Sequence, residues 1–164
     1  MRPIIAGIRS GPASAADPVR DAFARWASGV TVLAVDDDGD LLAMVASAFT
    51  PLSLDPPLAL VCVRADAAIL PSLEDVGRFT LNLLAEGQRR LASSLVSGNP
   101  VPADVFDRAP DPVLRGSLAS LVCTVHELLP GGDHRIVVGR VERVAAGPAA
   151  PPLLYHGREY RSLA

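Results

Sequence analysis

One stretch of the chain says most about its fold: Ala43-Met44-Val45-Ala46-Ser47-Ala48-Phe49-Thr50-Pro51-Leu52-Ser53-Leu54-Asp55-Pro56-Pro57-Leu58. It begins as an apolar strand, then places small and hydroxyl-bearing side chains close together, and it stops at a double proline. Small side chains let a flat ligand lie against the backbone, and hydroxyl groups and unpaired amides then bind its polar edge. The stretch therefore predicts one wall of a site for a planar cofactor.

The length and composition predict a single folded domain. A chain of 164 residues with 49% hydrophobic side chains can bury a core, which argues against disorder. The net charge is only -3 and the charges are interspersed, so the basic patch that a nucleic-acid partner requires is not expected. All 15 basic residues are arginines, so a phosphate group has to be held by Arg, hydroxyl or backbone N–H groups.

The cysteines and the N-terminal segment predict a location for the protein. Cys62 and Cys123 both lie inside apolar runs, which favours buried free thiols in a reducing cytosol. The apolar patch from Pro3 to Ile8 is too short for a signal peptide or a membrane span. We expect a cytoplasmic protein that does not bind membranes, with a flexible N-terminal arm over residues 1–16 and one domain over 17–164.

The first predicted helix begins at Asp17-Pro18, an acidic N-cap followed by proline at the first helical position. Its apolar face is formed by Val19, Ala22, Phe23 and Trp26. We expect Phe23 and Trp26 to enter the core rather than to form a stacking surface, and Gly29 to end the helix.

Hairpins dominate the rest of the pattern. A turn at Asp36–Asp40 joins strands at Val30–Val35 and Leu41–Phe49. The further expected strands are Leu58–Val63, Arg78–Leu84, Ser117–Leu128 and Arg135–Val144, and a short strand or turn follows at Leu153–Leu163. Two further helices are expected, one from Asp66 to about Val76 and one from Glu86 to Val96. Pro71 falls inside the first of them, so that helix either starts later or is kinked. So much antiparallel β-structure in one domain predicts a barrel with helices packed outside.

The polar side chains leave several alternatives open. The three histidines, His126, His134 and His156, lack zinc-ligand spacing, so no metal site is expected. His134 sits at a hairpin mouth, where it either reaches a cavity or is an exposed turn residue. Ser47, Thr50 and Ser53 are either ligand donors or strand-end hydroxyls that bind local backbone. The absence of a nucleophile-elbow pattern disfavours hydrolysis.

Six motifs occur in one order along the chain. They are Ala27-Ser28-Gly29-Val30-Thr31-Val32; Ser47-Ala48-Phe49-Thr50 leading into Ser53-Leu54-Asp55-Pro56-Pro57-Leu58; Val61-Cys62-Val63; Phe79-Thr80-Leu81-Asn82-Leu83-Leu84; Gly132-Asp133-His134; and Leu153-Leu154-Tyr155-His156-Gly157. Together they resemble the flavin reductase-like family with the FMN-binding split-barrel fold, over roughly Asp17 to Leu163.

The resemblance implies a mainly β fold with peripheral helices, namely an antiparallel split β-barrel that forms a homodimer. It also implies an NAD(P)H-dependent flavin reductase that binds FMN or FAD and accepts hydride from NADH or NADPH. Hydride passes directly from nicotinamide C4 to flavin N5, so such a protein mainly has to stack two rings. The reduced flavin is then released to a flavin-dependent monooxygenase, which is a transient partner.

The resemblance also implies roles for particular residues. His134 is expected on the nicotinamide side as the catalytic, hydrogen-bonding or orienting group. The flavin-binding residues that it implies are Val45, Ala46, Ser47, Ala48, Thr50, Ser53, Cys62, Val63, Arg64, Asn82, Tyr155, His156 and Tyr160.

Some positions depart from the family pattern. Val45 stands where Thr is usual and Pro51 where Ser is usual, which removes hydroxyl groups from the expected flavin edge. After Arg64, the residues Ala65-Asp66-Ala67-Ala68 provide few polar groups that could bind a phosphate. The Asp66 carboxylate repels a phosphate unless the side chain points away from the site. Two alternatives therefore stay open: a split barrel without reductase activity that binds or transforms another planar or hydrophobic ligand, and a non-catalytic dimeric partner of an oxygenase.

Overall fold

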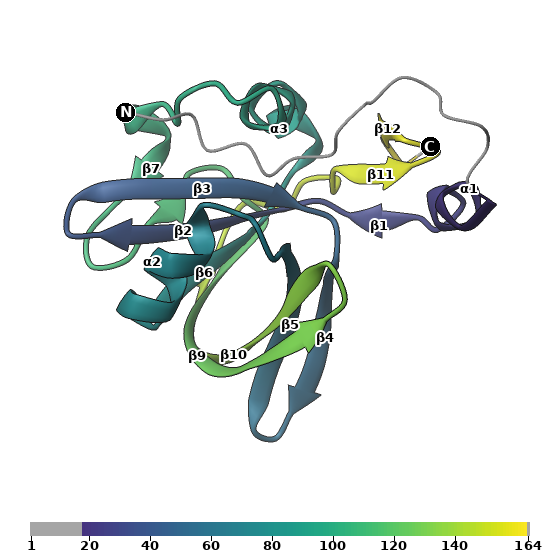
Figure 1. The fold of residues 1–164 in the computed structure, drawn as a ribbon. Helices are drawn as coiled ribbons and strands as arrows, with labels where there is room; N and C mark the ends of the chain where they lie inside the picture. Colours follow the sequence, from purple (N-terminus) through teal and green to yellow (C-terminus); the bar gives the residue numbers. More distant parts are fainter. Residues whose placement is uncertain (1–17, 164) are drawn as a thin grey trace.

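A computed structural model describes residues 18–163. Seven strands form the main sheet, in the order β3-β2-β6-β9-β10-β5-β4, and every neighbouring pair is antiparallel (Figure 1). Their bounds are β2 Thr31–Asp37, β3 Asp40–Ala46, β4 Phe49–Leu54, β5 Pro57–Arg64, β6 Arg78–Leu83, β9 Ala119–Gly131 and β10 His134–Ala146. The predicted antiparallel β architecture is confirmed.

The two edge strands of this sheet, β3 and β4, are consecutive in the chain, with only Ser47 and Ala48 between them. The three residue steps from Ala46 to Phe49 span at most about 11 Å, so the two edges must come close and the sheet has to curl. Register shifts between β9 and β10, at Val138/Gly139 and at Val141/Arg143, supply bends that curling requires. The predicted strand Leu41–Phe49 is therefore interrupted at Ser47-Ala48, where the chain passes from one edge to the other.

The core has two parts because side chains of a strand alternate between its faces. On β2, Leu33 and Val35 enter one buried cluster, and Val32 and Ala34 enter the other. Helix α2, Ile69–Val76, covers the first cluster with Ile69, Leu70 and Leu73. Helix α3, Arg89–Val96, follows the short helix η1, Glu86–Gln88, and covers the second cluster.

Of the two readings of the helix around Pro71, the later start is confirmed. Helix α2 begins at Ile69 rather than at Asp66, because Asp66 binds Arg64 instead of capping the helix, and Pro71 then falls in the first turn, where proline is tolerated. The predicted end of the first helix is wrong. Helix α1, Pro18–Ala24, ends before Gly29, and Ser28–Gly29 forms strand β1. The expected cap at Asp17 and the arm over residues 1–16 lie outside the described residues.

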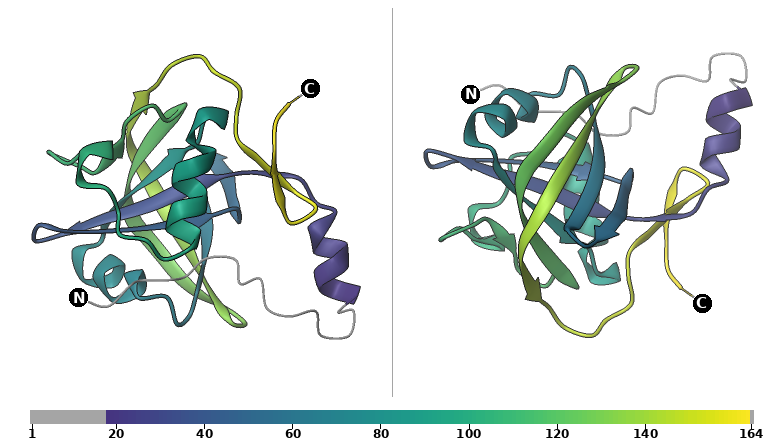
Figure 2. Two further views of the ribbon diagram at one scale, coloured as in Figure 1. Left: turned by 90° about the horizontal axis from the view of Figure 1, so that it is seen from above. Right: turned by 90° about the horizontal axis from the view of Figure 1, so that it is seen from below.

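A small second sheet, β1-β11-β12, lies with α1 at one end of the molecule, away from the main sheet (Figure 2). Strands β11, Leu154–His156, and β12, Glu159–Arg161, form the predicted C-terminal element as a hairpin. Strand β1 pairs with β11. The main sheet and this small module together enclose the site described below.

The segment from Ser97 to Pro112, which follows α3, contains short elements. Helix η2, Ala103–Val105, and strand β7, Phe106–Asp107, lie within it, and β7 pairs with β8, Val113–Leu114. Asp111, whose side chain is 2% exposed, binds both Arg78 on β6, at 2.5 Å, and Arg143 on β10, at 3.1 Å. These ion pairs fasten the segment to the main sheet.

Candidate functional site

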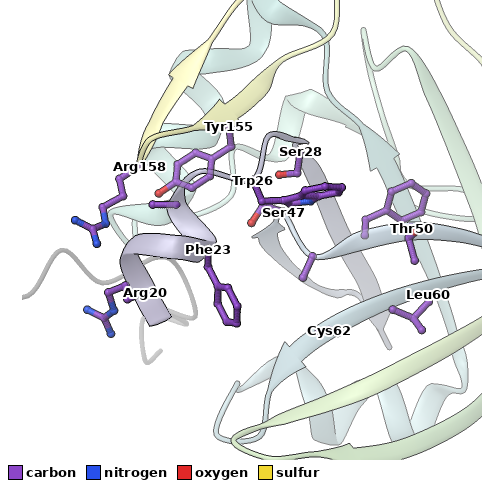
Figure 3. A pocket seen from close by; sticks show the side chains of 13 residues that line it. Arg20, Phe23, Trp26, Ser28, Ser47, Thr50, Leu60, Cys62, Tyr155 and Arg158 are labelled. Atoms are coloured by element: carbon purple, nitrogen blue, oxygen red, sulfur yellow. The ribbon is translucent and has the colours of Figure 1, made fainter. Parts of the chain in front are cut away.

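A pocket of about 560 Å³ lies between α1 and the β4–β5 hairpin, with β11 beside it (Figure 3). Most of its lining is apolar or aromatic. The aromatic side chains that line it are Phe23, Trp26, Phe49 and Tyr155. Small-molecule sites typically combine such walls with a few polar groups that orient the ligand.

The junction between β3 and β4 provides polar groups at the pocket wall. Ser47, Ala48 and Thr50 all line the pocket, as predicted. The carbonyl oxygen of Ala48 accepts a hydrogen bond from the Cys62 N–H at 2.9 Å. Within residues 18–163, neither the Ser47 hydroxyl nor the N–H groups of Ser47 and Ala48 are recorded in a hydrogen bond. These donors are therefore available to the edge of a ligand.

Phe23 and Trp26 correct the prediction that they enter the core. Their exposed fractions are 74% and 78%, and α1 buries none of its residues. The helix has no strand of the main sheet beneath it and is held instead by the C-terminal hairpin. The Gly157 N–H donates to the Ala24 carbonyl oxygen at 2.8 Å, and Arg158 forms an ion pair with Asp21. The apolar side of α1 thus faces the pocket.

Tyr155 and Tyr160 meet edge to face, with ring centroids 5.8 Å apart. Tyr155 lines the pocket, whereas Tyr160 packs against the second core cluster beside it. Burial raises the pKa of both phenols, and the charge of Arg158 partly opposes this rise at Tyr155. The Tyr155 phenol is therefore uncharged at physiological pH and forms part of the pocket wall. His156 is exposed and does not line the pocket.

Cys62 lines the pocket and is only partly buried, which corrects the prediction of two buried thiols. Cys123 is buried as predicted, and burial raises its pKa to about 12. Burial also raises the pKa of Cys62. Both thiols are therefore protonated at neutral pH, and Cys62 acts on a ligand as a small apolar surface.

Four residues assigned to flavin binding are buried in the protein interior rather than at the pocket: Val45, Ala46, Val63 and Asn82. The Asn82 Nδ2 donates to the Val32 carbonyl oxygen at 3.1 Å, and its Oδ1 accepts from the Leu114 N–H and the Ser120 hydroxyl at 2.9 and 2.6 Å. Its hydrogen-bonding capacity is used within the core. Val45 belongs to the second core cluster, so the hydroxyl expected there has no access to the pocket.

Arg64, Ser53 and His134 also lie outside the pocket lining. Arg64 makes two hydrogen bonds to Asp66, at 2.8 and 2.7 Å. His134 pairs with Arg64 in the β10–β5 register, and its Nδ1 lies 2.7 Å from the Asp133 carboxylate. That contact lowers the pKa of Asp133. The catalytic role of His134 stays a prediction.

The residues present fit a flavin. An isoalloxazine ring needs flat apolar faces and donors along one edge, and the aromatic walls and the Ser47-Ala48 junction offer both. Sequence reasoning found the junction but missed Phe23, Trp26 and the two arginines at the pocket, Arg20 and Arg158. The amphipathic pattern of α1 was the available signal, but it does not say whether its apolar side meets the core or a ligand.

A curled antiparallel sheet with this pocket defines the class of split-barrel flavin reductases, and comparison with known proteins agrees. The family model described as "Flavin reductase like domain" matches residues 23–164. The chain belongs to this family. Among the described residues there is no group of three or more potential metal ligands, and no helix long and apolar enough to cross a membrane.

Three relatives illustrate the similarity. The reductase component of 4-hydroxyphenylacetate 3-monooxygenase from Thermus thermophilus is 45% identical over 144 residues, which is 88% of this chain and 94% of that protein. BorF, the flavin reductase component of a bacterial two-component tryptophan halogenase, is 38% identical, with a TM-score of 0.81 over 89% of this chain and 96% of that one. The NADH:FAD oxidoreductase SgcE6 from Streptomyces globisporus, solved with NAD and FAD fragments, is 31% identical, with a TM-score of 0.82 over 93% and 98%.

The relatives are named as reductases, which favours the reductase over a split barrel that has lost this activity. The departures at Val45, Pro51 and Ala65-Asp66-Ala67-Ala68 carried the alternative. Val45 is buried away from the pocket, and Pro51 does not line it, so neither removes a group from the wall.

Proposed function

We propose that this chain is an NADH-dependent flavin reductase that reduces FAD or FMN and releases it to a separate flavin-dependent enzyme. The observation that carries the proposal is the pocket, in which aromatic walls face the unpaired donors of the β3–β4 junction. The names of the relatives, which include NADH-dependent flavin and FAD reductases and components of monooxygenases, support it.

The flavin supplies the chemistry by accepting hydride from the nicotinamide, and the protein binds and orients the two rings. Phe23, Trp26 and Tyr155 present apolar surface to ring faces. The N–H groups of Ser47 and Ala48 donate to the polar edge, where negative charge grows on reduction.

We also propose that His134 orients the nicotinamide. Cys62 lines the pocket on β5, and Arg64, two residues further along that strand, lies opposite His134. Two residues of a strand span about 7 Å, so a second ring stacked at this end of the pocket comes within reach of His134. His134→Ala should lower kcat for flavin reduction while leaving the melting temperature and the flavin Kd unchanged. Unchanged kcat would remove His134 from the site.

We further propose a cytoplasmic homodimer. Large apolar side chains are exposed on the β4–β5 hairpin outside the pocket, where Leu52 is 48% and Leu54 95% exposed. A monomer rarely leaves such surfaces uncovered. Light scattering should give twice the mass of one chain, and Leu54→Glu should shift the protein towards monomer. The two free thiols support a reducing compartment.

The deciding experiment is a pair of assays on the purified protein. NADH oxidation is followed by absorbance with FMN, with FAD and without flavin, and NADPH replaces NADH in a parallel series. Rapid flavin-dependent oxidation of NADH, slower with NADPH, is the expected result. A titration that shows flavin binding without turnover would contradict the reductase and favour a flavin carrier.

A further inference from the structure

We propose that α1 is a hinged lid over the pocket, and that its contacts with the C-terminal hairpin form a latch that holds the lid closed. The inference rests on the proposed function, because the lid regulates how long that same site retains its flavin. Helix α1 lies at the outer end of the molecule, beside the β11–β12 hairpin (Figure 2). The latch comprises the ion pair between Asp21 and Arg158. It also includes the hydrogen bond from the Gly157 N–H to the Ala24 carbonyl oxygen.

No buried side chain anchors α1 in the core. None of its residues is buried, and its largest apolar side chain, Phe23, is 74% exposed. A helix of seven residues is too short to be stable by itself in water, so its position depends on its contacts with the rest of the protein. Segments with few buried apolar contacts open at a low cost in free energy. Helix α1 can therefore move without disturbing either core cluster.

The latch is weak enough to open. Both partners of the ion pair are half-exposed, with side-chain exposures of 53% for Arg158 and 48% for Asp21. Exposed pairs contribute little stability, because water solvates both charges when they separate. The backbone hydrogen bond to Ala24 replaces a bond to water and so adds only modestly. Such a latch favours the closed lid and releases it at a small cost in free energy.

The joint of the lid lies directly after α1. Residues 25–27 are exposed and lie between the end of α1 and strand β1, which begins at Ser28. Beyond this point the chain is fixed, because β1 pairs with β11 and the Val30 N–H donates to the Leu153 carbonyl oxygen at 3.1 Å. Val30 and Leu153 are both buried in the second core cluster. Three exposed residues thus connect a helix that has no buried residue to a strand anchored in the core.

Closing the lid completes one wall of the pocket. Phe23 and Ala24 line it from α1, and Trp26 lines it from the joint. Figure 3 shows the Phe23 ring on the side of α1 that faces β5. A flavin stacked here covers apolar ring surface that otherwise meets water, which favours the closed lid. By linkage, the closed lid binds the flavin more tightly, so release of the reduced flavin requires α1 to open.

The latch is tested first without any ligand, by hydrogen exchange of the α1 amides. We expect Asp21→Asn to speed this exchange about threefold, which is the effect of losing one exposed ion pair. The charge-swapped double variant, Asp21→Arg with Arg158→Asp, should restore the wild-type rate. Glu159→Gln is the matched control, because it breaks an equally exposed ion pair with Arg161 on the same hairpin that does not involve α1. Trp26, the only tryptophan in the chain, gives a second readout, since its fluorescence anisotropy decay reports motion at the joint.

The coupling between lid and ligand is tested next, with FMN. At saturating FMN, exchange of the α1 amides should slow at least threefold, whereas the amides of α3, which does not line the pocket, should keep their rate. Stopped-flow dissociation of FMN should be about threefold faster from Asp21→Asn. The charge-swapped variant should return to within about twofold of wild type, and Glu159→Gln should dissociate like wild type.

Each outcome decides for or against the lid. If the α1 amides exchange equally fast with and without bound FMN, α1 is a fixed wall and the proposal is overturned. If the charge-swapped variant fails to restore the α1 exchange rate, the ion pair is not the latch, and the proposal is overturned as well. The ligand-free comparison needs no turnover. Faster α1 exchange in Asp21→Asn without any NADH oxidation would therefore support the lid and contradict the reductase.

Discussion

At the scale of single residues, exposure separates the side chains that serve the pocket from those that serve the core. Trp26 and Asn82 are the clearest pair. Trp26 is 78% exposed and lines the pocket, although its pattern suggested the core. Asn82 is fully buried and bonded within the core, although the family resemblance suggested the flavin site. Substitution of Trp26 should therefore affect ligand binding, whereas substitution of Asn82 should affect stability.

Trp26→Ala should weaken flavin binding about tenfold, because it removes an aromatic face worth on the order of 1 kcal/mol. The melting temperature should hardly change, since the side chain is exposed. Flavin fluorescence titration and thermal unfolding measure the two effects, and Trp26→Phe should retain most of the affinity. A large drop in melting temperature with intact affinity would place Trp26 in the folding core instead.

Asn82→Ala should destabilise the protein by about 2–4 kcal/mol. It leaves the Leu114 N–H and the Ser120 hydroxyl without their acceptor in the interior, and unmet buried groups cost about 1–3 kcal/mol each. Urea unfolding measures the loss, and Asn99→Ala, an exposed amide with one side-chain partner, is the matched control. A wild-type unfolding curve together with a raised flavin KM would restore Asn82 to the site.

At the scale of elements, the sheet reaches its curved form through local irregularities in β9 and β10. Gly139 lies at one of the register shifts, and the Phe79 ring of β6 packs against its backbone. A Cβ at Gly139 would lie 2.5 Å from Phe79 Cζ and 3.0 Å from Cys123 Cβ. The missing side chain at Gly139 thus makes room for Phe79, the largest fully buried side chain among the described residues.

Gly139→Ala should lower the free energy of unfolding by about 1–3 kcal/mol, because the added methyl group displaces the Phe79 ring in a close-packed core. Gly87→Ala is the control, since a Cβ there meets no atom within 4 Å. Chemical denaturation compares the two variants. Equal stability of both would show that the core relaxes around residue 139 without cost.

At the scale of the whole molecule, ion pairs fasten loops and termini to the barrel. The Asp111 carboxylate is held by Arg78 and Arg143, which join β6 and β10 to the segment before β8. Arg108 binds Asp36 at 2.7 Å and so ties the same segment to the β2–β3 hairpin. The two hydrogen bonds from Arg78 hold the pKa of Asp111 below its ordinary value, and the one from Arg143 adds to this.

This lowered pKa predicts a specific acid sensitivity. A carboxyl group whose pKa is lower in the folded than in the unfolded state stabilises the fold at neutral pH. That contribution is lost as the pH falls from about 3.9, the ordinary Asp value, towards the folded pKa. The free energy of unfolding should therefore fall more steeply over this range in wild type than in Asp111→Asn. Parallel slopes from urea unfolding at several pH values would contradict the assignment.

Much of this architecture was predictable because it is encoded locally. The turn at Asp36–Asp40 and the turn at Gly132-Asp133 join adjacent strands, and turn residues act over a few positions. The inward face of α2 follows from its periodicity. The site was predictable only in part, because Ser47, Thr50, Cys62 and Tyr155 line the pocket but other assigned residues do not.

The sequence by itself therefore determined the antiparallel strands, the hairpin turns, the apolar core and the family. Only the tertiary structure decided which surface each side chain meets. Val45 lies inside because the β3 face that it occupies is covered by the second core cluster, and Trp26 lies at the pocket because α1 rests on the C-terminal hairpin. Both outcomes depend on elements distant in sequence, and a local pattern carries no information about which distant element will cover it.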